Sequence, residues 1–217
     1  MTAHQTSRTA LAALALSAST AAMAHIGADG AAHIHAQDWT QSFAQGFSHP
    51  LTGLDHLAAM VSVGLWSVMS TSTPNTHTWR LASKPLAFAL TLLVGAVAGM
   101  AGLSLPGVEP MIAASLLVLG LLVASRAALP ATVGTGLVAA FAAFHGVAHG
   151  QELSGHALAA LSGMVLCTGL LHTAGMLGGL ALRALPQVNQ RWAERLTGAG
   201  VALFGATLMA PAIAVAL

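Results

Sequence analysis

Six continuous apolar runs dominate this sequence, and each has about the length needed to cross a lipid bilayer. A transmembrane helix takes about 20 apolar residues. The runs are rich in Ala and Leu and do not alternate with polar residues, so they predict helices rather than strands. The predicted fold class is therefore all-α, a polytopic membrane helix bundle of about six transmembrane helices. The runs extend roughly over Leu54–Ser72, Pro85–Leu105, Pro110–Ser125, Ala131–Gly150, Ala157–Leu182 and Leu196–Leu217.

Composition supports a membrane protein and excludes several other classes. Only 6% of the 217 residues are charged, whereas a soluble domain carries about 25%. A net charge of +1 gives no clustered basic footprint, so nucleic acid is not an expected partner. The single cysteine, Cys167, excludes an intramolecular disulfide and a thiolate zinc cluster. No GxxxxGK[ST] phosphate loop occurs, so the chain does not hydrolyse ATP by that route.

Residues 1–24 have the pattern of a secretory signal peptide. Arg8 supplies a positive charge, Ala10 to Leu16 form a short apolar core, and Ala22-Met23-Ala24 fits the small-x-small cleavage pattern. The alternative is an uncleaved first transmembrane helix. The apolar core is short and interrupted by serine and threonine, which favours cleavage.

Cleavage after Ala24 would leave a histidine-bearing periplasmic segment, residues 25–48, followed by a transmembrane domain, residues 49–217. His25 would then be the new N-terminus, and its free amine and imidazole could chelate a metal ion. Further polar residues lie close by: Asp29, His33, His35 and Asp38. The same residues are also compatible with a polar lead-in that has no ligand role.

The basic residues fix the predicted orientation. If His25 is outside and the six segments alternate, loops 72–84, 126–130 and 183–195 face inward. All the Lys and Arg residues that follow the signal then fall inside, as the positive-inside rule requires: Arg80, Lys84, Arg126, Arg183, Arg191 and Arg195. We therefore expect a multi-pass protein of the bacterial inner (cytoplasmic) membrane, with its mature N-terminus in the periplasm.

Histidine is the main ionisable residue, with 11 His against 7 Lys+Arg and 6 Asp+Glu. His145 and His149 are four residues apart, so on a helix they share a face with Cβ atoms about 5–6 Å apart. Glu152 lies three residues further on and can add an oxygen ligand from the same side. A second cluster far upstream contains His49, Asp55 and His56. The predicted orientation places both clusters at the same depth, near the external face.

Asp55 lies at the outer end of the first predicted segment, and His172 lies further inside, about two-thirds of the way across the fifth. A carboxylate at the centre of a membrane costs about 2.5–3.5 kcal/mol, less near the interface, and usually marks a pathway or a partner. Asp55 could instead satisfy free backbone N–H groups at a helix start, although the adjacent His56 favours a ligand role. His172 is either hydrogen-bonded between helices or a second station toward the cytoplasm. His77 and His156 are left without an assigned role.

The ligand types indicate which metals would bind. Imidazoles and carboxylates without thiolates favour a borderline divalent ion, namely nickel, cobalt or zinc. Neither a soft ligand set for copper(I) nor an all-oxygen set for magnesium is evident. Ligand type alone does not choose among the three.

Two motifs and the signal-like N-terminus resemble the HupE/UreJ family of membrane proteins. The motifs are His49-Pro50-Leu51-Thr52-Gly53-Leu54-Asp55-His56 and Phe144-His145-Gly146-Val147-Ala148-His149-Gly150-Gln151-Glu152. The resemblance implies a nickel permease, sometimes a cobalt one, that supplies metal for hydrogenase or urease maturation. It also implies that six residues carry metal binding or passage: His49, Asp55, His56, His145, His149 and Glu152. His25 and His172 lie outside these motifs.

Three functions are compatible with these residues, and importing a divalent metal is the one we favour. The transported ion would be Ni²⁺ or Co²⁺, with no organic cofactor and no enzyme activity. Because ligand histidines must be neutral, uptake should weaken as pH falls through about 6. An intramembrane zinc-dependent hydrolase could use the same His/Asp cluster with Glu152 as base, but no HExxH motif is present. A bis-histidine haem protein would pair His56 or His149 with His172, and their predicted depths differ.

Overall fold

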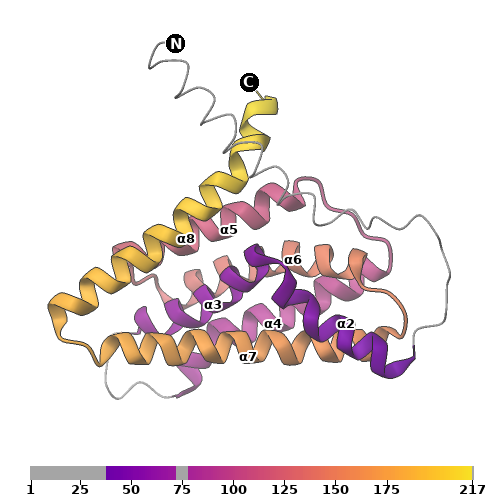
Figure 1. The fold of residues 1–217 in the computed structure, drawn as a ribbon, viewed down its shortest axis with the longest axis horizontal. Coiled ribbons are helices and arrows are strands. Elements are labelled where there is room, and N and C mark those ends of the chain that lie inside the picture. Colours follow the sequence, from indigo (N-terminus) through magenta and orange to yellow (C-terminus); the bar gives the residue numbers. More distant parts are fainter. Residues whose placement is uncertain (1–37, 72–77, 217) are drawn as a thin grey trace, which may run out of the picture. The chain divides into compact units, whose positions relative to one another are not determined.

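The computed structural model describes residues 38–71 and 78–216, and these residues form helices without any strand. The all-α prediction is therefore confirmed. The predicted signal peptide and His25, His33, His35 and His77 lie outside the described residues. The described residues form seven helices, which are labelled in Figure 1: α2 (Trp39–Thr52), α3 (Leu54–Met69), α4 (Thr78–Met100), α5 (Val108–Ser125), α6 (Ala131–Glu152), α7 (Ala157–Arg183) and α8 (Gln187–Ala216).

Helix α2 was not predicted from the sequence, which assigned most of its residues to the external segment 25–48. The compact unit that holds all seven helices begins at Ala36. The helix start has a local signal, because the Asp38 side chain accepts a 2.7 Å hydrogen bond from the Gln41 amide and the Gln41 side chain bonds back to the Asp38 amide. The bond from Gln41 holds the pKa of the Asp38 carboxyl below its ordinary value. A search for long apolar runs misses such a short, mixed-polarity helix.

Four helices are long and apolar enough to cross a membrane alone: α4, α5, α6 and α7. Helices α2 and α3 meet this criterion only together, and they are bent by 80° at the break between them, so they form a broken span or a re-entrant loop. The described part of α8 does not meet it, and its first turns carry charged residues. The described residues thus contain four such spans, or five with the bent pair, against about six predicted.

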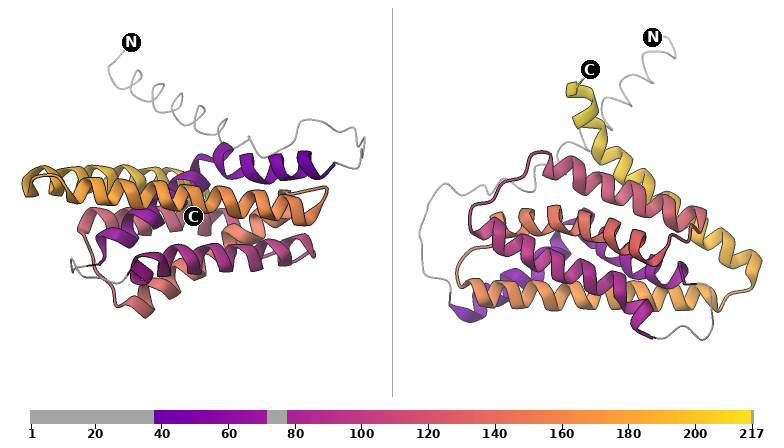
Figure 2. Two further views of the ribbon diagram at one scale, coloured as in Figure 1. Left: turned by 90° about the horizontal axis from the view of Figure 1, so that it is seen from below. Right: turned by 180° about the vertical axis from the view of Figure 1, so that it is seen from behind.

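Small residues let the helices approach one another closely. Helix α4 packs on α6, α5 on α8, and α7 on both α2 and α3; the pairing of α4 with α6 can be followed in Figure 2. A Cβ atom added to Gly146 would lie 2.3 Å from the Leu92 carbonyl oxygen, and one on Gly150 would lie 2.1 Å from that of Ala96. The contact between α4 and α6 therefore requires glycine at both positions, as expected for helices packed in lipid.

Helix α3 lies at the centre of the packing, because it contacts α2, α4, α5, α7 and α8. Ten of its 16 residues are buried. By contrast, α4 turns an apolar face outward, with Leu90 64% and Val94 69% exposed. Large apolar side chains on an outer surface are typical of helices that face lipid.

Candidate metal site

The six motif residues converge where three helix ends meet. His49 lies in the last turn of α2, Asp55 and His56 in the first turn of α3, and the other three in the last turns of α6. Gly53 joins α2 to α3 in an extended conformation (φ −87°, ψ 108°). The 80° bend at this residue allows the end of α2 and the start of α3 to face the same part of α6.

Four imidazole rings form a continuous cluster. Measured between ring centroids, His56 lies 4.4 Å from His149 and 5.0 Å from His145. His49 lies 4.9 Å from His149 and 6.5 Å from His56. Two motifs that are far apart in the sequence therefore meet in one place, which we call the histidine cluster (His49, His56, His145 and His149).

Each of the two carboxylates is paired with one imidazole of the cluster. Glu152 Oε2 lies 2.7 Å from His49 Nε2. Asp55 Oδ1 lies 2.8 Å from His56 Nδ1 and also accepts a 2.8 Å hydrogen bond from the His56 backbone amide. Asp55 thus serves both as a helix-start acceptor and as a partner that orients an imidazole, which fixes the tautomer in many metal sites.

The hydrogen bonds leave two imidazole nitrogens with available lone pairs. A neutral imidazole carries a proton on only one nitrogen, so when His56 Nδ1 donates to Asp55 the lone pair stays on Nε2. His145 Nε2 lies 3.0 Å from Ser115 Oγ, whose own proton goes to the Ile112 carbonyl at 2.6 Å. His145 Nε2 is therefore the donor, and Nδ1 keeps its lone pair. Both His56 Nε2 and His145 Nδ1 are buried, and neither has a hydrogen-bond partner within the described chain.

Burial increases along the cluster from one end to the other. The Glu152 side chain is 34% exposed and the His49 side chain 20%, while His145 and His149 are 0% exposed. His56 is 4% exposed. The partly exposed pair of His49 and Glu152 is thus the accessible end of the cluster, and His145 is the enclosed end.

The ring contacts are edge to face for His49–His149 and His56–His145, and tilted for His49–His56 and His56–His149. In residues 38–71 and 78–216, no group of three or more His, Cys, Asp or Glu side chains is arranged to hold a metal ion. Shared ligation by the cluster therefore requires the imidazoles to rotate about their side-chain torsions, which are broad for histidine χ2.

Comparison with known proteins assigns the family. The family model described as HupE / UreJ protein matches residues 12–208. This chain belongs to the HupE/UreJ family. It is 38% identical over 180 residues to Protein HupE of Rhizobium leguminosarum bv. viciae. The matched residues make up 82% of this chain and 90% of that protein. No solved structure matches the chain. Family membership and the membrane-length helices together make it a multi-pass membrane protein.

His172, the deeper candidate in this HupE/UreJ chain, lies apart from the histidine cluster. It is in α7, is 3% exposed, and contacts Phe88 with ring centroids 5.2 Å apart. Phe88 also lies 5.7 Å from His145, so its ring contacts both imidazoles. His172 Nε2 is buried and has no hydrogen-bond partner among the described residues.

Sequence reasoning missed two residues of this site, Ser115 and Phe88. Ser115 is a polar residue inside an otherwise apolar segment, and that signal could have identified it. Phe88 has no such signal, because an aromatic residue in an apolar helix looks like any core residue. His156, which has no role assigned from the sequence, is exposed at the start of α7, and its backbone amide donates to Ser42 Oγ at 2.9 Å.

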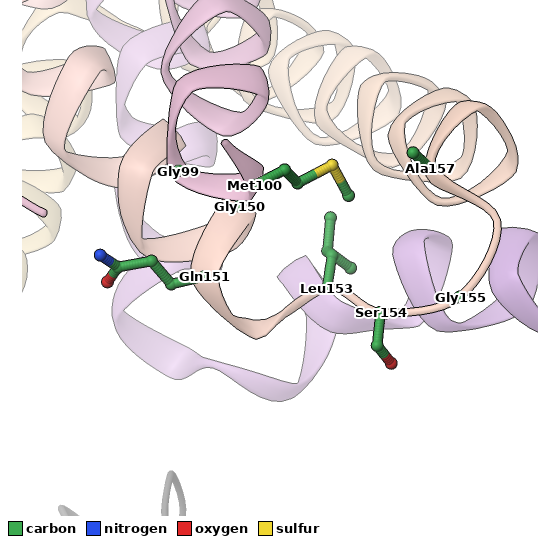
Figure 3. A pocket seen from close by; sticks show the side chains of 8 residues that line it. All are labelled: Gly99, Met100, Gly150, Gln151, Leu153, Ser154, Gly155 and Ala157. Carbon is green, nitrogen blue, oxygen red and sulfur yellow. The ribbon is translucent and has the colours of Figure 1, made fainter. Parts of the chain in front are cut away.

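A hollow of about 450 Å³ opens beside the end of α6. It lies between the end of α4 and the turn that joins α6 to α7, and Figure 3 shows the Met100 and Leu153 side chains facing each other across it. Its lining includes Gly150 and Gln151 of the second motif, but no imidazole or carboxylate. The hollow therefore adjoins the site but presents neither of the two ligand types found in the histidine cluster and its carboxylate partners.

Proposed function

We propose that this protein imports a divalent transition metal across the inner membrane, with nickel as the main substrate and cobalt the next. The observation that carries the proposal is the row of imidazoles and carboxylates that runs from a half-exposed end at Glu152 and His49 to the fully buried His145. Nitrogen-rich sites with some oxygen ligands suit Ni²⁺ and Co²⁺. The orientation expected from the basic residues puts the accessible end on the periplasmic side.

The side chains suggest a sequence of contacts for the ion. It would first displace the contact between Glu152 and His49, where the negative charge attracts a cation. It would then exchange water for the lone pairs of buried imidazoles, ending at His56 Nε2 and His145 Nδ1. Asp55 would hold His56 in the tautomer that offers Nε2, and the two carboxylates would offset the charge of a divalent ion in a low-dielectric region.

Other parts of the chain enter the proposal from the sequence alone. His25, outside the described residues, would capture the ion before it reaches Glu152. Proteins of hydrogenase or urease maturation would receive it in the cytoplasm.

The alternative, a zinc-dependent hydrolase, needs one closed ligand shell with an open water position. A row of ligands whose burial increases from one end to the other favours passage of an ion over catalysis at a single point.

Uptake of radioactive nickel and cobalt by cells that express the protein tests this proposal. Wild-type cells should show saturable uptake. His149→Ala and Asp55→Asn should each lower it by at least about tenfold, the lower end of the loss typical when a ligand or its orienting partner is changed. His156→Ala, which changes an exposed histidine outside the cluster, should leave uptake unchanged.

Membrane expression levels would show that the variants accumulate like the wild type. If wild-type cells take up neither metal above background, the permease proposal fails for these ions. Zinc content and a screen for hydrolase activity would then test the alternative.

A further inference from the structure

Among the described Lys and Arg residues, Lys84 is the one whose side chain is buried inside the helical unit. Sequence reasoning placed Lys84 in an inner loop, but the structure places it in the second turn of α4 with 4% of its surface exposed. Arg80, one turn earlier on the same helix, is exposed. An ionisable residue buried at membrane depth is costly, and it usually marks a pathway or a functional partner.

The partner of Lys84 is an aromatic ring rather than a carboxylate. Its Nζ lies 5.0 Å from the centroid of the Trp66 ring, which is 0% exposed. No ion pair within the described ranges involves Lys84. A Cβ atom added to Gly134 would lie 3.0 Å from both Lys84 Cε and Trp66 Cη2. The ammonium group thus lies among α3, α4 and α6, and its one compensating contact within residues 38–71 and 78–216 is the cation–π contact with Trp66.

Two of these helices, α3 and α6, also carry the buried part of the histidine cluster. The rise of 1.5 Å per residue puts Trp66 about 15 Å along α3 from His56, and Gly134 about 16 Å along α6 from His145. On α4, Lys84 lies one turn from Phe88 and shares its face, and Phe88 contacts His145. Lys84 therefore lies in the same core as the enclosed end of the cluster, toward its opposite end.

The surroundings of Lys84 are held in place by hydrogen bonds. Trp66 Nε1 donates to the Ala127 carbonyl at 3.1 Å. The neighbouring residue Ser67 donates through Oγ to the Leu81 carbonyl, and Arg183 donates to the carbonyl of Val68. The Lys84 side chain, by contrast, is a flexible four-carbon stem. It is the part of this region best able to move while the helices stay in place.

We propose that Lys84 is a cationic gate at the inner end of the metal pathway, closed while its ammonium group lies over Trp66. The inference rests on the proposed transport function. A fixed positive charge in a low-dielectric passage repels a divalent cation strongly, and positively charged side chains exclude cations from other membrane pores in this way. Movement of the stem away from the axis opens the passage.

Ion flux into liposomes tests the gate. The full chain is reconstituted with an entrapped metal-sensitive dye, and Ni²⁺, Co²⁺ or Mn²⁺ is added outside. Lys84→Met removes the charge but keeps the length of the stem. It should pass Ni²⁺ at least about tenfold faster than the wild type, because the charge repulsion is gone, and should also admit Mn²⁺. Lys84→Arg keeps the charge and should behave as the wild type.

A matched control lies on the same helix. Arg80 has its guanidinium carbon 5.6 Å from the Trp79 ring, but this cation–π pair is exposed. Arg80→Met should therefore leave both the rate and the ion preference unchanged. Size-exclusion chromatography would show whether each variant is folded, and Lys84→Gln gives the same neutral comparison if Lys84→Met is not.

The possible outcomes separate the gate from the transport function. If the wild type carries Ni²⁺ and the neutral variants match it in rate and ion preference, the gate is wrong while transport stands. If neither the wild type nor the neutral variants pass any ion, both proposals fail, since removing the charge opens no passage. Flux through the neutral variants alone supports the gate and shows that the wild type is closed in liposomes.

Discussion

His49 Nε2 lies 2.7 Å from Glu152 Oε2, and this contact joins the last turn of α2 to the last turn of α6. Both side chains are partly exposed, whereas the imidazoles behind them are not. The pair therefore stands at the accessible end of the histidine cluster. It gives the proposed pathway a first pair of ligands, one imidazole nitrogen and one carboxylate oxygen.

The charge of Glu152 should matter more for capturing the ion than for moving it inward. Glu152→Gln keeps the shape and a hydrogen bond to His49 but removes the negative charge. We expect the KM for nickel uptake to rise about tenfold, with a smaller change in maximal rate, because only the initial attraction is weakened. Uptake measured over a range of nickel concentrations separates the two constants. An unchanged KM would show that capture occurs elsewhere.

Ser115 should support uptake through His145. Its Oγ accepts the His145 Nε2 proton, so Ser115→Ala removes the bond that sets the tautomer. We expect uptake to fall about tenfold, as when the orienting partner of a ligand is lost. The matched control is Ser125→Ala on the same helix, because Ser125 Oγ bonds the backbone of its own helix at Leu121 and is exposed. Equal uptake by both variants would contradict this role.

The sequence predicted the helical class, the spans α4 to α7 and the six residues that meet at the site. Long apolar runs are visible in a sequence because lipid requires them. His145 and His149 could be placed on one face by helical spacing alone. The contact between the two motifs could be expected only from their shared depth, since no local pattern specifies which helices pack together.

The features that were missed depend on tertiary packing. The 80° bend at Gly53 makes α2 and α3 a broken pair rather than a loop followed by one span, and an extended glycine has no distinct signal in a sequence. Lys84 was expected in a loop because basic residues usually lie outside lipid. Its burial depends on the space left by Gly134 and the ring of Trp66, which no spacing rule contains.

A buried carboxylate at the start of α8 should make stability depend on Arg126. Arg126 Nε lies 2.8 Å from Glu194 Oε2, a side chain that is 1% exposed, and Gln190 Nε2 donates to Glu194 Oε1 at 2.7 Å. The contact with Arg126 is an ion pair rather than a well-aligned hydrogen bond. Arg126→Met removes the cation in contact with the buried charge and leaves the electrostatic interaction with Arg183. Breaking a buried pair in this way typically costs about 3 kcal/mol.

Glu194→Gln should cost less, because Arg126 is 43% exposed and water can solvate it. The control is Arg195→Met, an exposed cation on the same helix. Thermal unfolding in detergent compares the three variants, and we expect the midpoint to fall most for Arg126→Met and least for Arg195→Met. The reverse order for Arg126→Met and Glu194→Gln would mean that Gln190 and Arg183 stabilise the carboxylate without Arg126.

The glycines beside the imidazoles should tolerate no added methyl group. In Gly146→Ala the new Cβ would lie 2.3 Å from the Leu92 carbonyl oxygen, so the α4 and α6 backbones must move apart. We expect a loss of stability of about 1–3 kcal/mol, as for overpacked cores, together with reduced nickel uptake because His145 shifts with its helix.

The matched control is Gly136→Ala on the same helix, where nothing lies within 4 Å of the added Cβ. That change should be neutral or stabilising by up to about 1 kcal/mol, since alanine favours helix more than glycine does. Thermal unfolding and uptake measured on both variants decide the matter: similar stability for the two would show that α4 and α6 are not in close contact at Gly146.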